Sequence, residues 1–137
     1  MKNYAVVPLR LALGIIFIYH GLQKAFGFFG GPGIEGFAGM LTHINIPYPQ
    51  ILAIIVASIE LIGGIFLFLG TLVRLSATSI LMVMLVALAK IHFANGFSIM
   101  KGGYEYILLI ILTCIAVIIS GPGSLSITRK NSLFYKL

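Results

Sequence analysis

The sequence is poor in charged residues, which make up 9% of its 137 positions, whereas soluble domains contain about 25%. Only three residues are acidic, and tryptophan is absent. Hydrophobic residues account for 60% of the chain, and its mean hydropathy is +1.12. A soluble domain of this size cannot hide so much apolar surface, because much of any small protein remains exposed. The composition therefore predicts an integral membrane protein.

Cysteine is equally scarce, since Cys114 is the only one and lies inside an apolar run. Without a second cysteine, the chain cannot form the internal dithiol of a thiol–disulfide oxidoreductase. One cysteine and three dispersed histidines also lack the spacing of a metal site, so we expect no metal. The net charge of +6 comes from basic residues scattered between apolar runs. Because they form no basic patch, we expect no nucleic-acid partner.

Four apolar segments are present, at about residues 4–23, 50–69, 72–93 and 104–120. Each has about 17 to 22 residues, the length with which a helix crosses about 30 Å of hydrocarbon. The connections after the second and third segments are short, which makes neighbouring helices antiparallel. The sequence therefore predicts one all-α integral membrane domain over residues 1–137, an antiparallel bundle of four transmembrane helices.

The connection between the first two predicted helices is long and rich in glycine. Residues 26–49 contain six glycines, with apolar side chains such as Phe28, Phe29 and Phe37 between them. This pattern predicts a loop that lies at, or dips into, the membrane interface. Residues 31–36 satisfy the motif G-x-G-x-x-G, but they follow an apolar helix and no strand, so we do not expect a dinucleotide site.

Basic residues in the connections predict the orientation. Six belong to the side of the termini, and three to the side of the glycine-rich loop: Lys2, Arg10, Arg74, Arg129, Lys130 and Lys136, against Lys24, Lys90 and Lys101. Because positive residues concentrate on the cytoplasmic side of a membrane, we expect both termini in the cytoplasm and the glycine-rich loop outside.

Two ionisable residues fall deep inside the predicted helices. Glu60 lies eleven residues beyond Pro49, roughly 16 Å below the outer boundary. Arg10 lies fourteen residues before Lys24, roughly 21 Å below the same boundary. A charge inside the membrane costs several kcal/mol unless it is paired, and an arginine side chain can span the difference. We therefore predict a buried ion pair between Arg10 and Glu60, for which a structural and a functional role are both open.

Small residues share the faces of these two charges. Gly14 and Gly21 lie on the Arg10 face, and Ala57 and Gly64 lie on the Glu60 face. In lipid, small residues let helices approach each other closely. We therefore expect both faces to pack tightly against protein.

A second group of polar residues gathers at the outer ends of the predicted helices: His20, Lys24, Lys90, His92, Tyr104 and Glu105. Glu105 requires a nearby cation, for which these lysines and histidines and Lys101 are the candidates. Together such groups could transfer protons or hold the polar head of a ligand, or they could be hydrogen-bonded interface residues. His20 and His92 could also be axial ligands of a haem, but two histidines are a weak signal, and we do not expect haem.

The order and spacing of these residues resemble the DoxX family of small bacterial membrane proteins. The matching positions are Arg10, Gly14, Phe17, His20-Gly21, Lys24, Phe26-Gly27, Phe29 to Gly33, Glu60, Gly63-Gly64, Arg74, Asn95 to Phe97, Gly102 to Tyr106 and Gly121 to Gly123. They extend over about residues 6–125. The resemblance implies a multi-pass protein of the bacterial inner membrane, linked to thiosulfate:quinone oxidoreduction, quinol oxidase complexes or redox-stress complexes. Many members have no assigned activity.

We therefore expect a membrane subunit of a redox system that binds a quinone or anchors an oxidoreductase partner. Any enzymatic activity would be that of a quinone-linked oxidoreductase subunit. The alternatives are a transporter or channel for a small solute or a proton, and a non-catalytic membrane scaffold. The expected partners are the lipid bilayer, a redox protein and a second copy of the chain.

Overall fold

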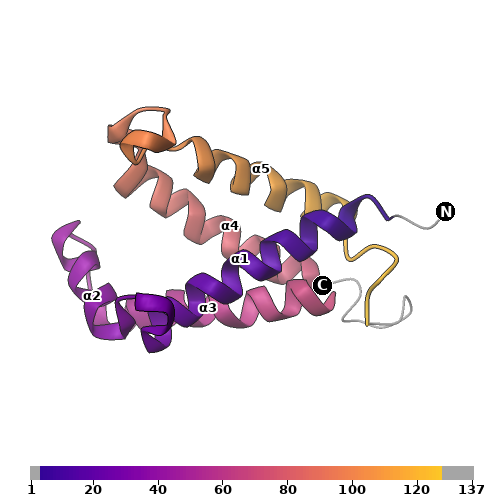
Figure 1. Ribbon diagram of the computed structural model, residues 1–137, viewed down its shortest axis with the longest axis horizontal. Helices are drawn as coiled ribbons and strands as arrows, with labels where there is room; N and C mark the ends of the chain where they lie inside the picture. Colours follow the sequence, from indigo (N-terminus) through magenta and orange to yellow (C-terminus); the bar gives the residue numbers. More distant parts are fainter. Residues whose placement is uncertain (1–3, 128–137) are drawn as a thin grey trace.

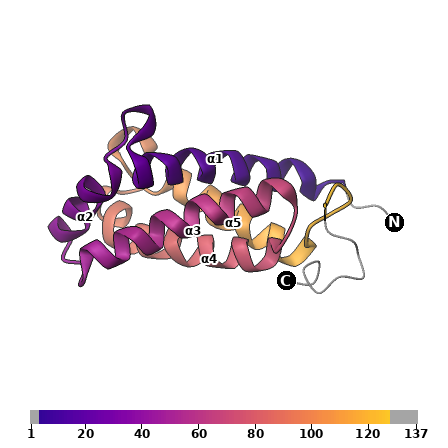
Figure 2. The ribbon, with the colours of Figure 1, turned by 90° about the horizontal axis from the view of Figure 1, so that it is seen from below.

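The computed structural model describes residues 4–127, and every regular element within that range is helical. Four helices run along the molecule: α1 (Val6–Phe26), α3 (Pro49–Leu69), α4 (Val73–Ala87) and α5 (Glu105–Ser120). A shorter helix, α2 (Gly33–His43), connects α1 to α3. Figure 1 shows α2 at the end of the molecule opposite the start of α1 and the end of α5. Figure 2 shows that the axes of α1, α3, α4 and α5 share one general direction.

The long helices have the length and composition of membrane spans. By these criteria α1, α3 and the helical stretch Val73–Asn95 can each cross a membrane, and α5 is a shorter apolar helix of 16 residues. Large apolar side chains such as Ile54, Met82 and Leu109 point outward, as they do in helices that face lipid. The prediction of an all-α membrane protein is therefore confirmed.

Helices α1 and α3 are antiparallel, and glycines bring their backbones into direct contact. A Cβ atom on Gly14 would lie 2.8 Å from the backbone nitrogen of Phe68, and one on Gly21 would lie 2.6 Å from Cα of Leu61. Gly64 of α3 fits against the backbone of α1 in the same way. These contacts confirm the predicted close packing and set the register, with Gly14 level with Phe68 and Gly21 level with Leu61.

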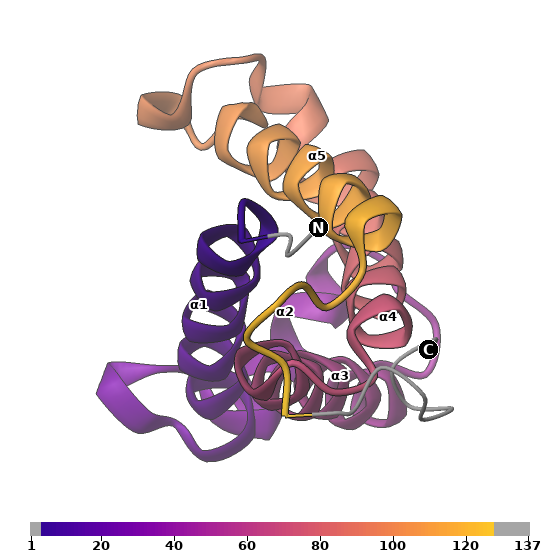
Figure 3. The same cartoon turned by 90° about the vertical axis from the view of Figure 1, so that its right-hand side faces the viewer.

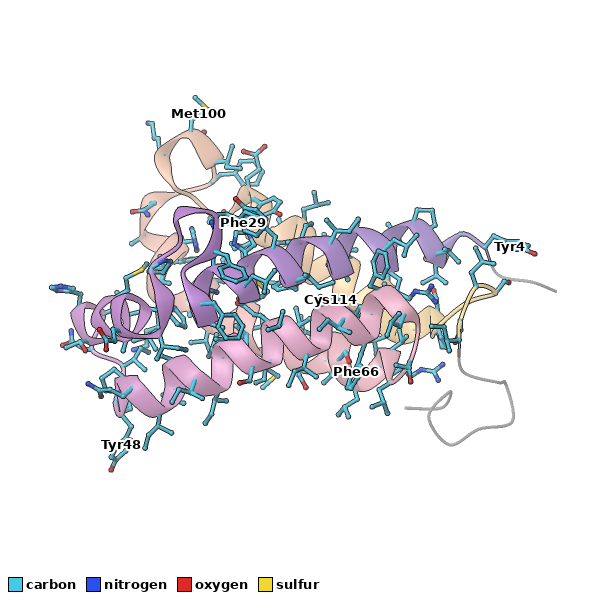
Figure 4. All side chains as sticks on the ribbon, turned by 60° about the horizontal axis from the view of Figure 1, so that its bottom comes forward. Tyr4, Phe29, Tyr48, Phe66, Met100 and Cys114 are labelled. Atoms are coloured by element: carbon cyan, nitrogen blue, oxygen red, sulfur yellow. The ribbon has the colours of Figure 1, made fainter. Side chains whose placement is uncertain are left out.

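The apolar core joins the α1–α3 pair to α4 and α5. Phe17 of α1, Ile80 of α4, and Cys114 and Val117 of α5 belong to one buried cluster. Cys114 is completely buried within it, in agreement with its position inside an apolar run. Figure 4 labels Cys114 in the middle of the bundle, far from Tyr4 at one end and Met100 at the other.

The glycine-rich connection differs from its prediction, because part of it is a helix. Residues Gly33–His43 form α2, and Phe37, Ala38 and Leu41 bury one face of it against Ala53 of α3. Glycine disfavours a helix by about 1 kcal/mol per residue, so the packing of these apolar residues on α3 stabilises it. As a result, α2 covers the first turns of α3.

The segment after α5 turns back across the opposite end of the bundle, as Figure 3 shows. The Ser126 hydroxyl donates to the carbonyl of Gly70 at 2.5 Å, and the Ile127 amide donates to the carbonyl of Leu69 at 3.3 Å. Both acceptors lie at the C-terminal end of α3, where backbone carbonyls lack partners within the helix. The segment Gly121–Ile127 therefore closes the end of the bundle that lies farthest from α2.

Candidate functional site

A pocket of about 540 Å³ lies between α3 and α4 at the α2 end of the molecule. Its walls are almost entirely apolar and come from α2, α3, α4 and the segment between α2 and α3. The polar side chains that line it are Lys24, Glu60, Ser79 and Lys90. Both its volume and this ratio of apolar wall to polar groups are typical of sites that bind small molecules.

A buried ion pair lies in this pocket. The Nζ atom of Lys24 is 2.5 Å from Oε1 and 2.7 Å from Oε2 of Glu60, so one ammonium group holds both carboxylate oxygens. The Glu60 side chain is 0% exposed and that of Lys24 is 23% exposed. Lys24 also lies 4.9 Å from the centre of the Phe37 ring, where an aromatic face attracts a cation.

The contact between α1 and α3 explains why these two residues meet. Gly21 touches the backbone at Leu61, which places the next turn of α1 beside the part of α3 that contains Glu60. Lys24, three residues after Gly21, lies on the same face of α1, because residues three apart are neighbours on a helix. The backbones are so close that its side chain reaches directly into the pocket.

The predicted ion pair between Arg10 and Glu60 is therefore wrong, although both residues are buried, at 2% and 0% exposed. Gly14 is level with Phe68, so Arg10, one turn earlier in α1, lies at the far end of α3, beside Gly70. Ten residues of α3 separate this point from Glu60, which corresponds to roughly 15 Å. Arg10 thus lies at one end of the bundle, whereas Glu60 lies near the middle of α3.

The error came from the assumption that Lys24 and Pro49 mark the same membrane depth. Since Gly21 is level with Leu61, Lys24 is level with about Ser58, nine residues into α3. It therefore lies roughly 13 Å nearer to the middle of α3 than Pro49 does. A lysine that the sequence placed at the boundary is in fact the counter-ion of the buried glutamate.

Arg10 instead holds the segment that follows α5. Its Nη1 donates to the carbonyl of Pro122 at 2.5 Å, and its Nη2 donates to the carbonyl of Leu125 at 2.6 Å. Arg74 makes a similar contact, because its Nε donates to the carbonyl of Ile118 at 3.0 Å. Arg10 therefore binds the segment after α5, and Arg74 binds a carbonyl in the last turn of α5, where a cation is favoured.

Three of the predicted outer residues organise the connection between α4 and α5. His92 Nδ1 donates to the carbonyl of Gly102 at 2.8 Å, and the Glu105 carboxylate accepts from the amide of Ile99 at 3.0 Å. The Tyr104 ring packs against two phenylalanine rings. Within residues 4–127, Glu105 forms no ion pair, so the predicted cation beside it is not found there.

His20 and Lys90 have different surroundings. His20 Nδ1 lies 3.1 Å from the side-chain oxygen of Gln23, and the ring meets the edge of Tyr19, which stacks on Phe29. Figure 4 labels Phe29 close to α1. Lys90 lies in a π-helical turn, Leu88–His92, and lines the pocket. The structure thus brings Lys24 and Lys90 to the pocket, whereas His20, His92, Tyr104 and Glu105 do not line it.

These features define a small all-helical membrane protein with a buried ion pair in an apolar pocket. The profile of the DoxX family matches residues 5–93, and the chain belongs to this family. The matched range extends from α1 into the π-helical turn after α4. It therefore includes Lys24, Glu60 and Lys90, which are all the charged residues that line the pocket.

Three relatives cover most of the chain. The “Putative oxidoreductase CatD” of Bacillus subtilis is 32% identical over 87% of this chain and 81% of its own length. An uncharacterized protein of Haemophilus influenzae is 31% identical over 92% of this chain and 82% of its own. An uncharacterized membrane protein of Mycobacterium tuberculosis is 30% identical over 93% of this chain and 82% of its own. No solved structure matches the chain.

Proposed function

We propose that the chain is a membrane subunit of a redox system and that its pocket binds a quinone. The observation that carries this proposal is an apolar pocket of about 540 Å³ that contains the buried Lys24–Glu60 ion pair. A quinone has a flat ring with two carbonyl oxygens and an apolar tail. Apolar walls with a few placed polar groups suit such a ligand.

Lys24 is the residue that would bind a carbonyl oxygen of the quinone. Its ammonium group has three N–H donors, and the two oxygens of Glu60 occupy two of the directions around it. The third donor remains for a ligand. When a quinone is reduced, negative charge develops on its oxygens, and a fixed ammonium group stabilises that charge. Glu60 keeps the ammonium group in place.

The electrons would come from a redox protein bound to this subunit. The relative from Bacillus subtilis is named as an oxidoreductase, which supports a redox role. The exposed side chains of Met82 and Val86 line the pocket, so the pocket borders the surface that lipid would cover. A quinone dissolved in the membrane could therefore reach the site without passing through water.

Purification in a mild detergent, followed by chromatography of the extracted lipid, tests this function. We expect quinone to co-purify with the protein and to be lost in a Glu60→Gln variant, because Lys24 is then no longer fixed. Glu35→Gln is the matched control, because Glu35 lies exposed on α2 and does not line the pocket. Wild-type protein that carries no quinone and binds none on titration would refute the proposal.

We propose further that α5 is the fourth membrane span of an antiparallel bundle in the bacterial inner membrane, with both termini in the cytoplasm. Its 16 residues are apolar and share the buried core with the other long helices. Labelling of single cysteines with a membrane-impermeant maleimide, in a Cys114→Ala background, tests the orientation. Met100→Cys should react in intact cells, and Tyr4→Cys only after permeabilisation. The reverse pattern would invert the topology.

A further inference from the structure

The charges that line the pocket do not cancel. Lys24 and Glu60 neutralise each other, which leaves Lys90 as the third charged residue of the lining. In the part of the chain that the structure describes, Lys90 has neither an ion pair nor a hydrogen-bond partner for its side chain. The pocket therefore carries one positive charge without a counter-ion.

The local fold keeps this charge at the pocket. Lys90 belongs to the π-helical turn Leu88–His92 at the end of α4, and Lys90 and Ile91 both line the pocket. Such turns are rare and occur frequently at functional sites. Lys90 is exposed, as a lysine near a membrane boundary ordinarily is, and it also borders a cavity with apolar walls.

An apolar environment strengthens the attraction between opposite charges, because the effective dielectric constant is lower than in water. The charge of the Glu60 carboxylate is already neutralised by Lys24, which binds both of its oxygens. Within the lining of the pocket no other acidic residue is present. An anionic ligand in the pocket would therefore meet, in Lys90, a cation that no residue of the lining neutralises.

We infer that the pocket prefers ligands whose polar head is an oxyanion on an apolar body, and that Lys90 determines this preference. The inference rests on the proposed quinone site, and it names the class of quinone: one with an acidic hydroxyl group on the ring. Lys24 binds a carbonyl oxygen of such a ligand, and Lys90 neutralises the ionised hydroxyl group.

Two ligands that differ in charge but hardly in shape test the inference. One is a 2-hydroxy-3-alkyl-1,4-naphthoquinone, which is ionised at neutral pH, and the other is the 2-methyl compound with the same alkyl chain, which is neutral. Their dissociation constants are measured in detergent for wild type, Lys90→Gln, Lys90→Arg and Lys101→Gln. Lys101 is the matched control, because it is an exposed lysine of the neighbouring connection and does not line the pocket.

We expect wild-type protein to bind the ionised quinone roughly two- to fivefold more tightly than the neutral one. Lys90→Gln should abolish the difference and leave the affinity for the neutral quinone unchanged, because only the charge is lost. Lys90→Arg and Lys101→Gln should keep the difference in affinity between the two quinones. The two quinones can partition unequally into micelles, but this effect is the same for all four proteins. A change in the ratio of the two dissociation constants between variants therefore comes from the pocket.

The outcomes separate this inference from the proposed function. If wild type and Lys90→Gln show the same ratio of affinities, the charge preference is refuted while the quinone site stands. If neither quinone binds to wild type, the proposed function is refuted. Dodecanoate, a fatty acid with the same charge, distinguishes the sources of the oxyanion. If dodecanoate binds, and its binding depends on Lys90, while neither quinone binds, the pocket is an anion site whose ligand is a fatty acid.

Discussion

Removal of Lys24 should destabilise the protein more than removal of Glu60, although the two form one ion pair. In Lys24→Met, a carboxylate that is 0% exposed loses its counter-ion, and breaking a buried pair in this way costs about 3–5 kcal/mol. In Glu60→Leu, the remaining lysine is 23% exposed, and its flexible chain can carry the ammonium group toward the surface. We expect a cost of about 1–2 kcal/mol for that variant.

The double variant Lys24→Met/Glu60→Leu should be more stable than Lys24→Met alone, because it buries no unpaired charge. The free energies of unfolding can be measured by circular dichroism during titration of detergent-solubilised protein with SDS. Lys101→Met is the control for loss of an exposed lysine and should change little.

Equal destabilisation by Lys24→Met and Glu60→Leu would refute this reasoning, because it would show that the exposure of the two side chains does not decide the cost. A coupling energy near zero in the double-mutant cycle would refute the ion pair itself.

Three further variants test other contacts. Gly21→Ala should destabilise the protein by about 1–3 kcal/mol, because the new Cβ would lie 2.6 Å from a backbone atom of α3. Gly39→Ala is its control, because a Cβ there meets nothing within 4 Å. This control should unfold no earlier than wild type in the same SDS titration. Arg10→Met should expose the segment after α5 to limited proteolysis, since two hydrogen bonds to its carbonyls are lost; cleavage no faster than in wild type would contradict this role. Glu105→Gln should accelerate hydrogen exchange at the amide of Ile99 without changing the affinity for quinone, and a loss of affinity would place Glu105 in the binding site.

Hydropathy predicted the long helices well, because the length of a span is fixed by the thickness of the membrane. The predicted segments 50–69 and 72–93 agree closely with α3 and with Val73–Asn95. The helix α2 was missed, because its glycines predict a loop. Only its packing on α3 favours a helix. A contact between distant parts of the chain decided the local structure.

The sequence predicted which charged residues are buried, but it did not predict which groups they pair with. A charge inside an apolar run must be shielded from lipid, which identified Arg10 and Glu60. Their partners depend on the register of α1 against α3, which the spacing of Gly14 and Gly21 alone does not determine. The carbonyls that bind Arg10 belong to an irregular segment more than a hundred residues away, and no pattern in the sequence indicates them.

The direct backbone contact between α1 and α3 also determines which parts of the pocket can move. Because α1 and α3 touch at Gly14, Gly21 and Gly64, the two helices cannot slide past each other without a steric clash. The positions of Lys24 and Glu60 relative to each other are therefore fixed. The helical stretch Val73–Asn95 buries less of its surface against the rest of the described chain than α1 does. A ligand therefore meets one wall in which two backbones are packed together and carry the ion pair, and one less buried wall that carries Lys90. If the α4 wall shifts to fit a ligand, the Lys24–Glu60 pair keeps its place, and only the position of Lys90 changes.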